Sequence, residues 1–178
     1  IVFFGKILDY KGVEDLLAAF AAVPADAPAE LVVAGQCDDQ PMRSRLRAAA
    51  GERVVLRLGR IAEQEVAPLL ASADAVVLPY RRVTTSGSAM LALAYARPLI
   101  VPQLDAFADF PAEAIIRYDG TPEALTPALT WVARARTPAL AAMGAAARAY
   151  AATLSWPDIA ARTRAEMASV LAVRGVAR

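Results

Sequence analysis

Residues 1–23, IVFFGKILDYKGVEDLLAAFAAV, contain the pattern that indicates the fold class most clearly. It begins with a short apolar run of β-type residues, 1–4, and continues through a loop that carries Gly5 and Gly12 into a helical pattern over 13–23. A strand, a glycine-bearing loop and a helix in this order are typical of the first βα unit of a parallel sheet. The sequence therefore predicts an α/β protein.

The same alternation of apolar runs and helical patterns continues as far as Tyr118, and only helical patterns follow it. It predicts a three-layer α/β/α, Rossmann-like, doubly wound parallel sheet of six strands with extra C-terminal helices, forming one domain over residues 1–178. The expected strands are residues 1–4, 31–34, 54–58, 74–78, 99–101 and 115–118. The expected helices are 13–23, 41–50, 63–71 and 88–96 between strands, then 122–136, 139–153 and 157–173.

Composition and charge exclude several classes of protein. Hydrophobic residues make up 57% of the chain and the formal net charge is +1, which argues against disorder and against a nucleic-acid partner. Cys37 is the only cysteine and there is no histidine, so we expect no disulfide framework, no metal site and no imidazole base. A lone cysteine fits a reducing, cytoplasmic setting.

The ends and the apolar stretches bear on how the chain is used. No apolar run approaches the roughly 20 residues that cross a bilayer, because arginines interrupt the alanine-rich stretch that comes nearest. The first residues read as a strand already under way, with no initiator methionine and no signal peptide before them. We therefore expect the chain to be a piece of a longer protein.

Two loops are expected to face each other at one edge of the sheet. In the strand order 3-2-1-4-5-6, ligands bind beyond the carboxyl ends of strands one and four, where the connections diverge. The loop after strand one is residues 5–12, and the loop after strand four is residues 80–88. A ligand is therefore expected between these two loops.

Lysine usage singles out the first loop. Of 19 basic residues only Lys6 and Lys11 are lysines, and both lie in this loop. A lysine is a compact charge on a flexible stem that can follow phosphate oxygens, and Gly5 and Gly12 let the backbone bend close to a ligand. The alternative is that both lysines are ordinary solvated charges and both glycines simply form turns.

The second loop ends in hydroxyl residues and a glycine, Thr85-Ser86-Gly87-Ser88, where a helix is expected to begin. Ser86 or Ser88 could cap this helix. The free N–H groups of a helix start also favour an anion, and both roles are compatible. Together with the lysines, this loop predicts a site for a diphosphate.

The remaining polar residues have plainer interpretations. Glu63 and Glu65 are expected to be favourable charges in the first turn of a helix. Asp38 and Asp39 could line the crevice, although a solvated loop is the preferred interpretation, and Arg81 could reach a phosphate or lie exposed in its loop.

Five landmarks in order make nearly the whole chain resemble the donor-binding, C-terminal domain of family 4 (group 1) glycosyltransferases with the GT-B fold. In that family a Gly-Arg/Lys pair is followed by four residues and Lys-Gly. The matching stretches are residues 4–13, 31–35, 58–61 followed by 63–70, 73–80 and 97–101.

The resemblance implies retaining transfer of a sugar from a nucleotide-diphosphate donor, a UDP- or GDP-sugar, without a cofactor or an obligatory metal. It implies that Lys6 and Lys11 neutralise the leaving diphosphate and act as the catalytic cations. It implies further that the backbone amides of residues 86–88 meet the same phosphates, and that Arg60 and Ile61 flank the base.

The resemblance also implies a context and contains one departure. Many relatives carry Glu-x7-Glu where this chain has Val83 and Leu91. Residues 79–81 and 85–88 resemble the sequence of a bacterial subgroup that lacks both glutamates and serves polysaccharide or glycolipid synthesis. The glycan or lipid-linked acceptor would be held by an N-terminal domain absent from this chain, which alone would be inactive. The full enzyme would be cytoplasmic, with peripheral association at the inner face of the cell membrane left open.

Other classes of function stay open. A sugar-nucleotide epimerase has the same two-domain architecture, and product analysis without an acceptor would identify it. A non-catalytic nucleotide- or phosphate-binding module would have the same loops. A pure interaction domain would bind no nucleoside diphosphate at all.

Overall fold

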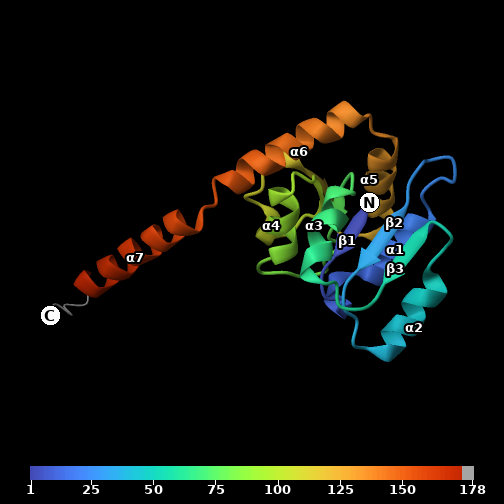
Figure 1. Cartoon of the computed structure of the whole chain (residues 1–178), viewed down its shortest axis with the longest axis horizontal. Coiled ribbons are helices and arrows are strands. Elements are labelled where there is room, and N and C mark those ends of the chain that lie inside the picture. The colour runs from blue at the N-terminus through green and yellow to red at the C-terminus, as the bar shows by residue number, and fades with distance from the viewer. Residues whose placement is uncertain (174–178) are drawn as a thin grey trace.

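One sheet of six parallel strands forms the centre of the protein in a computed structural model that describes residues 1–173 (Figure 1). The strand order is β3-β2-β1-β4-β5-β6, which confirms the predicted topology. The strands are β1 (Val2–Phe4), β2 (Leu31–Ala34), β3 (Val54–Arg57), β4 (Val76–Val77), β5 (Leu99–Pro102) and β6 (Ile115–Tyr118).

Seven helices in the described part of the chain follow the predicted pattern, and their ends lie within about two residues of the predicted ones. They are α1 (Val13–Ala21), α2 (Gln40–Ala49), α3 (Glu63–Ala71), α4 (Gly87–Ala94), α5 (Pro122–Arg134), α6 (Thr137–Ala152) and α7 (Trp156–Val173). Three single 3-10 turns were not predicted from the sequence: η1 (Asp9–Lys11), η2 (Asp105–Phe107) and η3 (Ala112–Ala114). Turns of three residues are too short to show a helical period.

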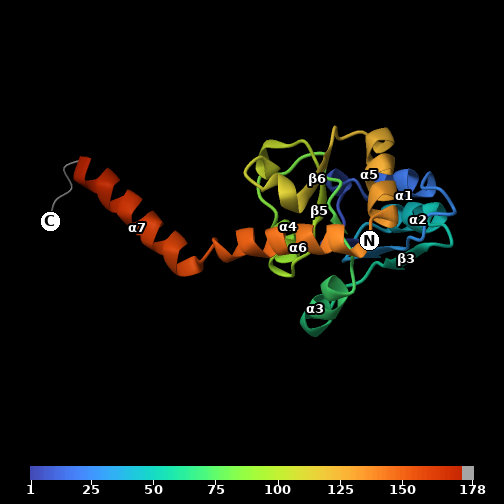
Figure 2. The ribbon, with the colours of Figure 1, turned by 90° about the horizontal axis from the view of Figure 1, so that it is seen from above.

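The helices cover both faces of the sheet, as the three-layer prediction requires. Helix α1 packs against α2 and α5, whereas α4 packs against α6, and Figure 2 shows α3 on the side of the sheet opposite α1 and α2. Neighbouring residues of β1 serve different layers, since Phe3 belongs to the main core and Val2 to a smaller cluster with Leu69 of α3. The strand is therefore buried on both faces, which explains its continuous apolar sequence.

Strand β4 is shorter than the predicted 74–78. Val76 and Val77 pair with β5, and only Val76 also pairs with β1, opposite Val2. The Leu78 N–H still bonds to the Ile100 carbonyl at 2.9 Å, after which the chain leaves the sheet toward α4. The end of β4 therefore lies beside the loop that follows β1.

Helix α4 ends at Ala94, two residues before the predicted end. Ala96 adopts a left-handed backbone with φ 56°. Gly144 of α6 lies directly against the Ala96 carbonyl, where a Cβ atom would overlap with it. The close packing of α6 therefore accompanies the turn that ends α4.

Helix α7 extends away from the rest of the chain (Figures 1 and 2). Its apolar side chains Ile159, Met167, Val170 and Leu171 are between 40% and 64% exposed. Within residues 1–173, no helix combines the length and the apolar character needed to cross a membrane.

Candidate functional site

The loops after β1 and β4 meet at the carboxyl edge of the sheet, as the strand order predicts. A Cβ atom placed on Gly5 would lie 2.9 Å from Ser88 Oγ. The Arg81 N–H donates to the Tyr10 carbonyl at 2.8 Å. The structure therefore brings the lysine-bearing loop against the start of α4.

Two glycines permit this close approach of backbones. Gly12 follows η1 with φ 66°, and a Cβ atom there would overlap with the Pro79 carbonyl at the end of β4. Gly35, after β2, lies equally close to the Gly5 carbonyl. A side chain at either position would push the loops apart, so Gly12 and Gly35 are needed for the close packing of the loops that form the crevice.

Lys11 lies on an aromatic surface at the end of η1. Its Nζ atom is 3.7 Å from the centroid of the Tyr80 ring and 5.4 Å from that of Tyr10. Tyr80 is only 1% exposed, so its ring is held in place by the surrounding core and the ammonium group lies over its face. The ammonium is attracted to the negative face of this ring.

Lys6 lies toward the loop after β2 instead. Its Nζ atom forms an ion pair with Asp38 Oδ2 at 3.1 Å, and both side chains are more than half exposed. The Gln36 amide donates to Asp38 Oδ1 at 2.7 Å. Gln36 and Lys6 together hold the pKa of Asp38 below its usual value. Asp38 is therefore exposed, in agreement with its interpretation as a solvated loop residue, and it is also the ion-pair partner of the predicted site residue Lys6.

Ser86 caps α4, which settles the first role proposed for the hydroxyl residues of this loop. Its Oγ atom accepts from the Ala89 N–H at 3.1 Å. Within residues 1–173, the Gly87 and Ser88 amides donate to no other backbone or side-chain group. Thr85 is exposed just before the cap. The cap thus coexists with two amides that are available to an anion.

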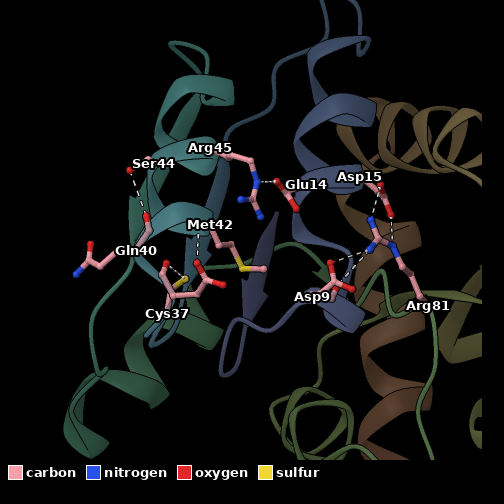
Figure 3. Close-up of polar contacts among 10 residues, drawn as sticks. Asp9, Glu14, Asp15, Cys37, Gln40, Met42, Ser44, Arg45 and Arg81 are labelled. Atoms are coloured by element: carbon pink, nitrogen blue, oxygen red, sulfur yellow. Dashed lines mark hydrogen bonds and ion pairs between the residues drawn. The ribbon is translucent and has the colours of Figure 1, made fainter.

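Arg81 has a structural role that sequence reasoning did not identify. Its guanidinium group binds Asp15 of α1 with Nε 2.8 Å from Oδ2, and Asp9 of η1 with NH1 3.2 Å from Oδ1 (Figure 3). Both carboxylates belong to the segment that follows β1. Arg81 therefore ties the two loops together and is not directed at a ligand.

Three acidic residues have the structural roles that their positions favour. Asp39 caps α2 by accepting from the Met42 N–H at 2.8 Å, a role that its place just before Gln40-Pro41 could have indicated. Glu63 and Glu65 lie in the first turn of α3, as predicted, and Glu65 also pairs with Arg57.

Arg60 and Ile61 lie apart from this cluster, in the connection between β3 and α3. Arg60 is exposed, and no ion pair or hydrogen bond in the described part of the chain joins it to the lysines or to α4. Ile61 packs against the small apolar cluster beneath α3. Their role beside a base stays a prediction.

The positions of the two family glutamates hold apolar side chains. Val83 and Leu91 are half-buried and pack against the main core. Residues 1–173 also contain no cluster of three or more His, Cys, Asp or Glu side chains that could hold a metal ion. The absence of acidic side chains at 83 and 91 leaves the two lysines as the predicted charged groups of the donor site.

Comparison with known proteins places these features in a family. The family model of group 1 glycosyl transferases matches residues 1–135. A GDP-mannose:glycolipid 4-beta-D-mannosyltransferase of Xanthomonas campestris pv. campestris is 34% identical over 104 residues, which are 57% of this chain and 30% of that protein.

Solved structures share the fold. Sucrose-phosphate synthase from Thermosynechococcus elongatus superposes with a TM-score of 0.81 at 22% identity, over 97% of this chain and 45% of that one. Anabaena HepE in complex with UDP gives a TM-score of 0.76 at 18% identity, over 96% of this chain and 48% of that one. The chain thus spans less than half the length of each of these proteins. Fold, motif order and family match agree, and the chain belongs to the group 1 glycosyltransferases, with the Rossmann-like architecture of a GT-B domain.

Proposed function

We propose that this chain is the donor-binding domain of a retaining glycosyltransferase and binds the diphosphate of a UDP- or GDP-sugar. The observation that carries the proposal is the close approach of Gly5 to Ser88 at the start of α4, with the Lys11 ammonium held on the ring of Tyr80, whose hydroxyl contacts the α4 cap Ser86. Lys6, paired with Asp38 and more than half exposed, adds a second cation on the same loop. An anion between them would face positive groups on two sides.

Such an arrangement acts on the leaving group of glycosyl transfer. Negative charge on the diphosphate grows as the bond to the sugar breaks, so fixed positive groups stabilise the transition state more than the bound donor. In this proposal Lys6 and Lys11 are the catalytic cations, the 86–88 amides hold the phosphates, and Arg60 and Ile61 flank the base. No metal or other cofactor is required for this chemistry.

The acceptor would be a glycan or a lipid-linked glycan, held by a second, N-terminal domain of the full-length enzyme. The Xanthomonas relative, named for a glycolipid acceptor, and the Anabaena structure with UDP support this choice of partners. We place the reaction in bacterial polysaccharide or glycolipid synthesis, in the cytoplasm, with peripheral association at the inner face of the cell membrane left open. Retention is tested by the anomeric configuration of the product of the full enzyme, which NMR reads directly.

A thermal-shift panel tests donor binding on the chain itself. Nucleoside diphosphate at 100 times its dissociation constant should raise stability by about 2.7 kcal/mol. We expect UDP or GDP, and the corresponding sugar nucleotides, to raise the melting temperature. Lys11→Ala should remove most of this shift, and Glu63→Ala, a charge change in α3, should leave it intact. Equal shifts for both variants would contradict the proposed site.

A further inference from the structure

Tyr80 is fixed at the point where the two loops of the crevice touch. The residue before it, Pro79, lies against Gly12, and the residue after it, Arg81, donates its N–H to the Tyr10 carbonyl at 2.8 Å. The backbone on both sides of Tyr80 is therefore fixed to the loop after β1.

The Tyr80 ring is equally constrained. It is buried and packs on Phe107 with 6.2 Å between ring centroids. Phe107 in turn packs on Phe110 at 5.7 Å. The ring therefore cannot turn away from Lys11, whose Nζ atom lies 3.7 Å from its centroid.

The phenol group of the same residue reaches the other wall of the crevice. Ser86 Oγ donates to the Tyr80 hydroxyl oxygen at 3.4 Å, while accepting from the Ala89 N–H. The cap of α4 and the ammonium of Lys11 thus contact one buried side chain. In the described part of the chain, no other residue makes a polar or cation–π contact with both the Ser86 side chain and the Lys11 ammonium.

We propose that Tyr80 is a positioning residue of the donor site, which holds the Lys11 ammonium at a set place relative to the amide terminus of α4. This role rests on the proposed function. An ammonium that already lies on a fixed ring loses less conformational freedom when a phosphate binds, so the affinity for the diphosphate rises without direct contact between Tyr80 and the ligand.

The contact itself can be measured without any ligand, because the chain has only two lysines. In protein labelled with 13C at lysine Cε, the Lys11 methylene protons should be shifted upfield by the ring current of Tyr80, and those of exposed Lys6 should not. Tyr80→Phe should keep this shift and Tyr80→Leu should remove most of it, leaving the smaller part that the more distant Tyr10 ring contributes. Phe20→Leu, which removes another buried ring, is the control for packing loss and should keep it. Two coincident lysine signals in the wild type would overturn the proposal without recourse to a variant.

Calorimetric titration with UDP and GDP then tests the role of the contact. Tyr80→Leu should weaken binding by up to about tenfold, the loss expected when the ligand itself must order one long side chain, whereas Tyr80→Phe should stay within about threefold of the wild type. Wild-type affinity in Tyr80→Leu would overturn the positioning role and leave the donor site standing. Absence of binding in the wild type would refute the donor site and, with it, the role of Tyr80.

Discussion

Replacing Gly12 by alanine tests the close approach of the two loops that form the crevice. The substitution places a side chain on a backbone with φ 66°, a left-handed conformation that costs a non-glycine residue about 1–2 kcal/mol. The added Cβ would overlap with the Pro79 carbonyl oxygen and lie 3.1 Å from its carbon. Displacing a packed backbone in this way costs about 1–3 kcal/mol more, which is typical of overpacking.

We therefore expect Gly12→Ala to lower the free energy of unfolding by about 3 kcal/mol. For a domain of this length the melting temperature should fall by roughly 6–12 °C. Urea denaturation followed by circular dichroism measures the free energy, and thermal denaturation measures the temperature. The matched control is Gly51→Ala, because nothing lies within 4 Å of a Cβ atom there. Equal stability of the two variants would refute the close packing of η1 against the end of β4.

Three further substitutions test the start of α4, the ion pairs of Arg81 and the ion pair of Asp38. Gly87→Ala should raise the free energy of unfolding by about 0.5–1 kcal/mol in urea denaturation, because alanine favours a helix and nothing lies within 4 Å of the added methyl, yet it should weaken calorimetric binding of UDP or GDP. Arg81→Met should lower the free energy of unfolding by about 1 kcal/mol, through loss of two partly exposed ion pairs, and this loss should shrink as salt rises. The pKa of Asp38 is held below its usual 3.8 in the folded chain, so its stabilising effect is full above that pH and is lost as the pH falls through the lower folded value. Wild type should therefore exceed Asp38→Asn in stability at pH 6, and the two should converge in acid denaturation.

The sheet and its helices could be predicted because their signals are local. Each strand is a short apolar run and each long helix has its own apolar period, so the order of elements was readable from the sequence. The strand order then places residues 5–12 opposite residues 80–88 by a rule of topology. The structure confirms that these loops meet.

The side-chain contacts within the crevice could not be predicted, since they join residues far apart in sequence. Arg81 and Asp15 are 66 positions apart, and their pairing depends on how η1 and α1 lie against the end of β4. The burial of Tyr80 beneath Lys11 depends on Phe107, which reaches it from beyond β5. Such contacts are set by tertiary packing, which a single sequence does not report.

The decisive experiment on the diphosphate site follows the backbone amide signals of the 15N-labelled chain as UDP or GDP is added. The largest shifts are expected at the Gly87 and Ser88 amides, accompanied by shifts at the backbone amides of Lys6 and Lys11. The proposed site is contradicted if those amides stay unchanged while shifts gather at the opposite edge of the sheet, around Ser72 and Asp74.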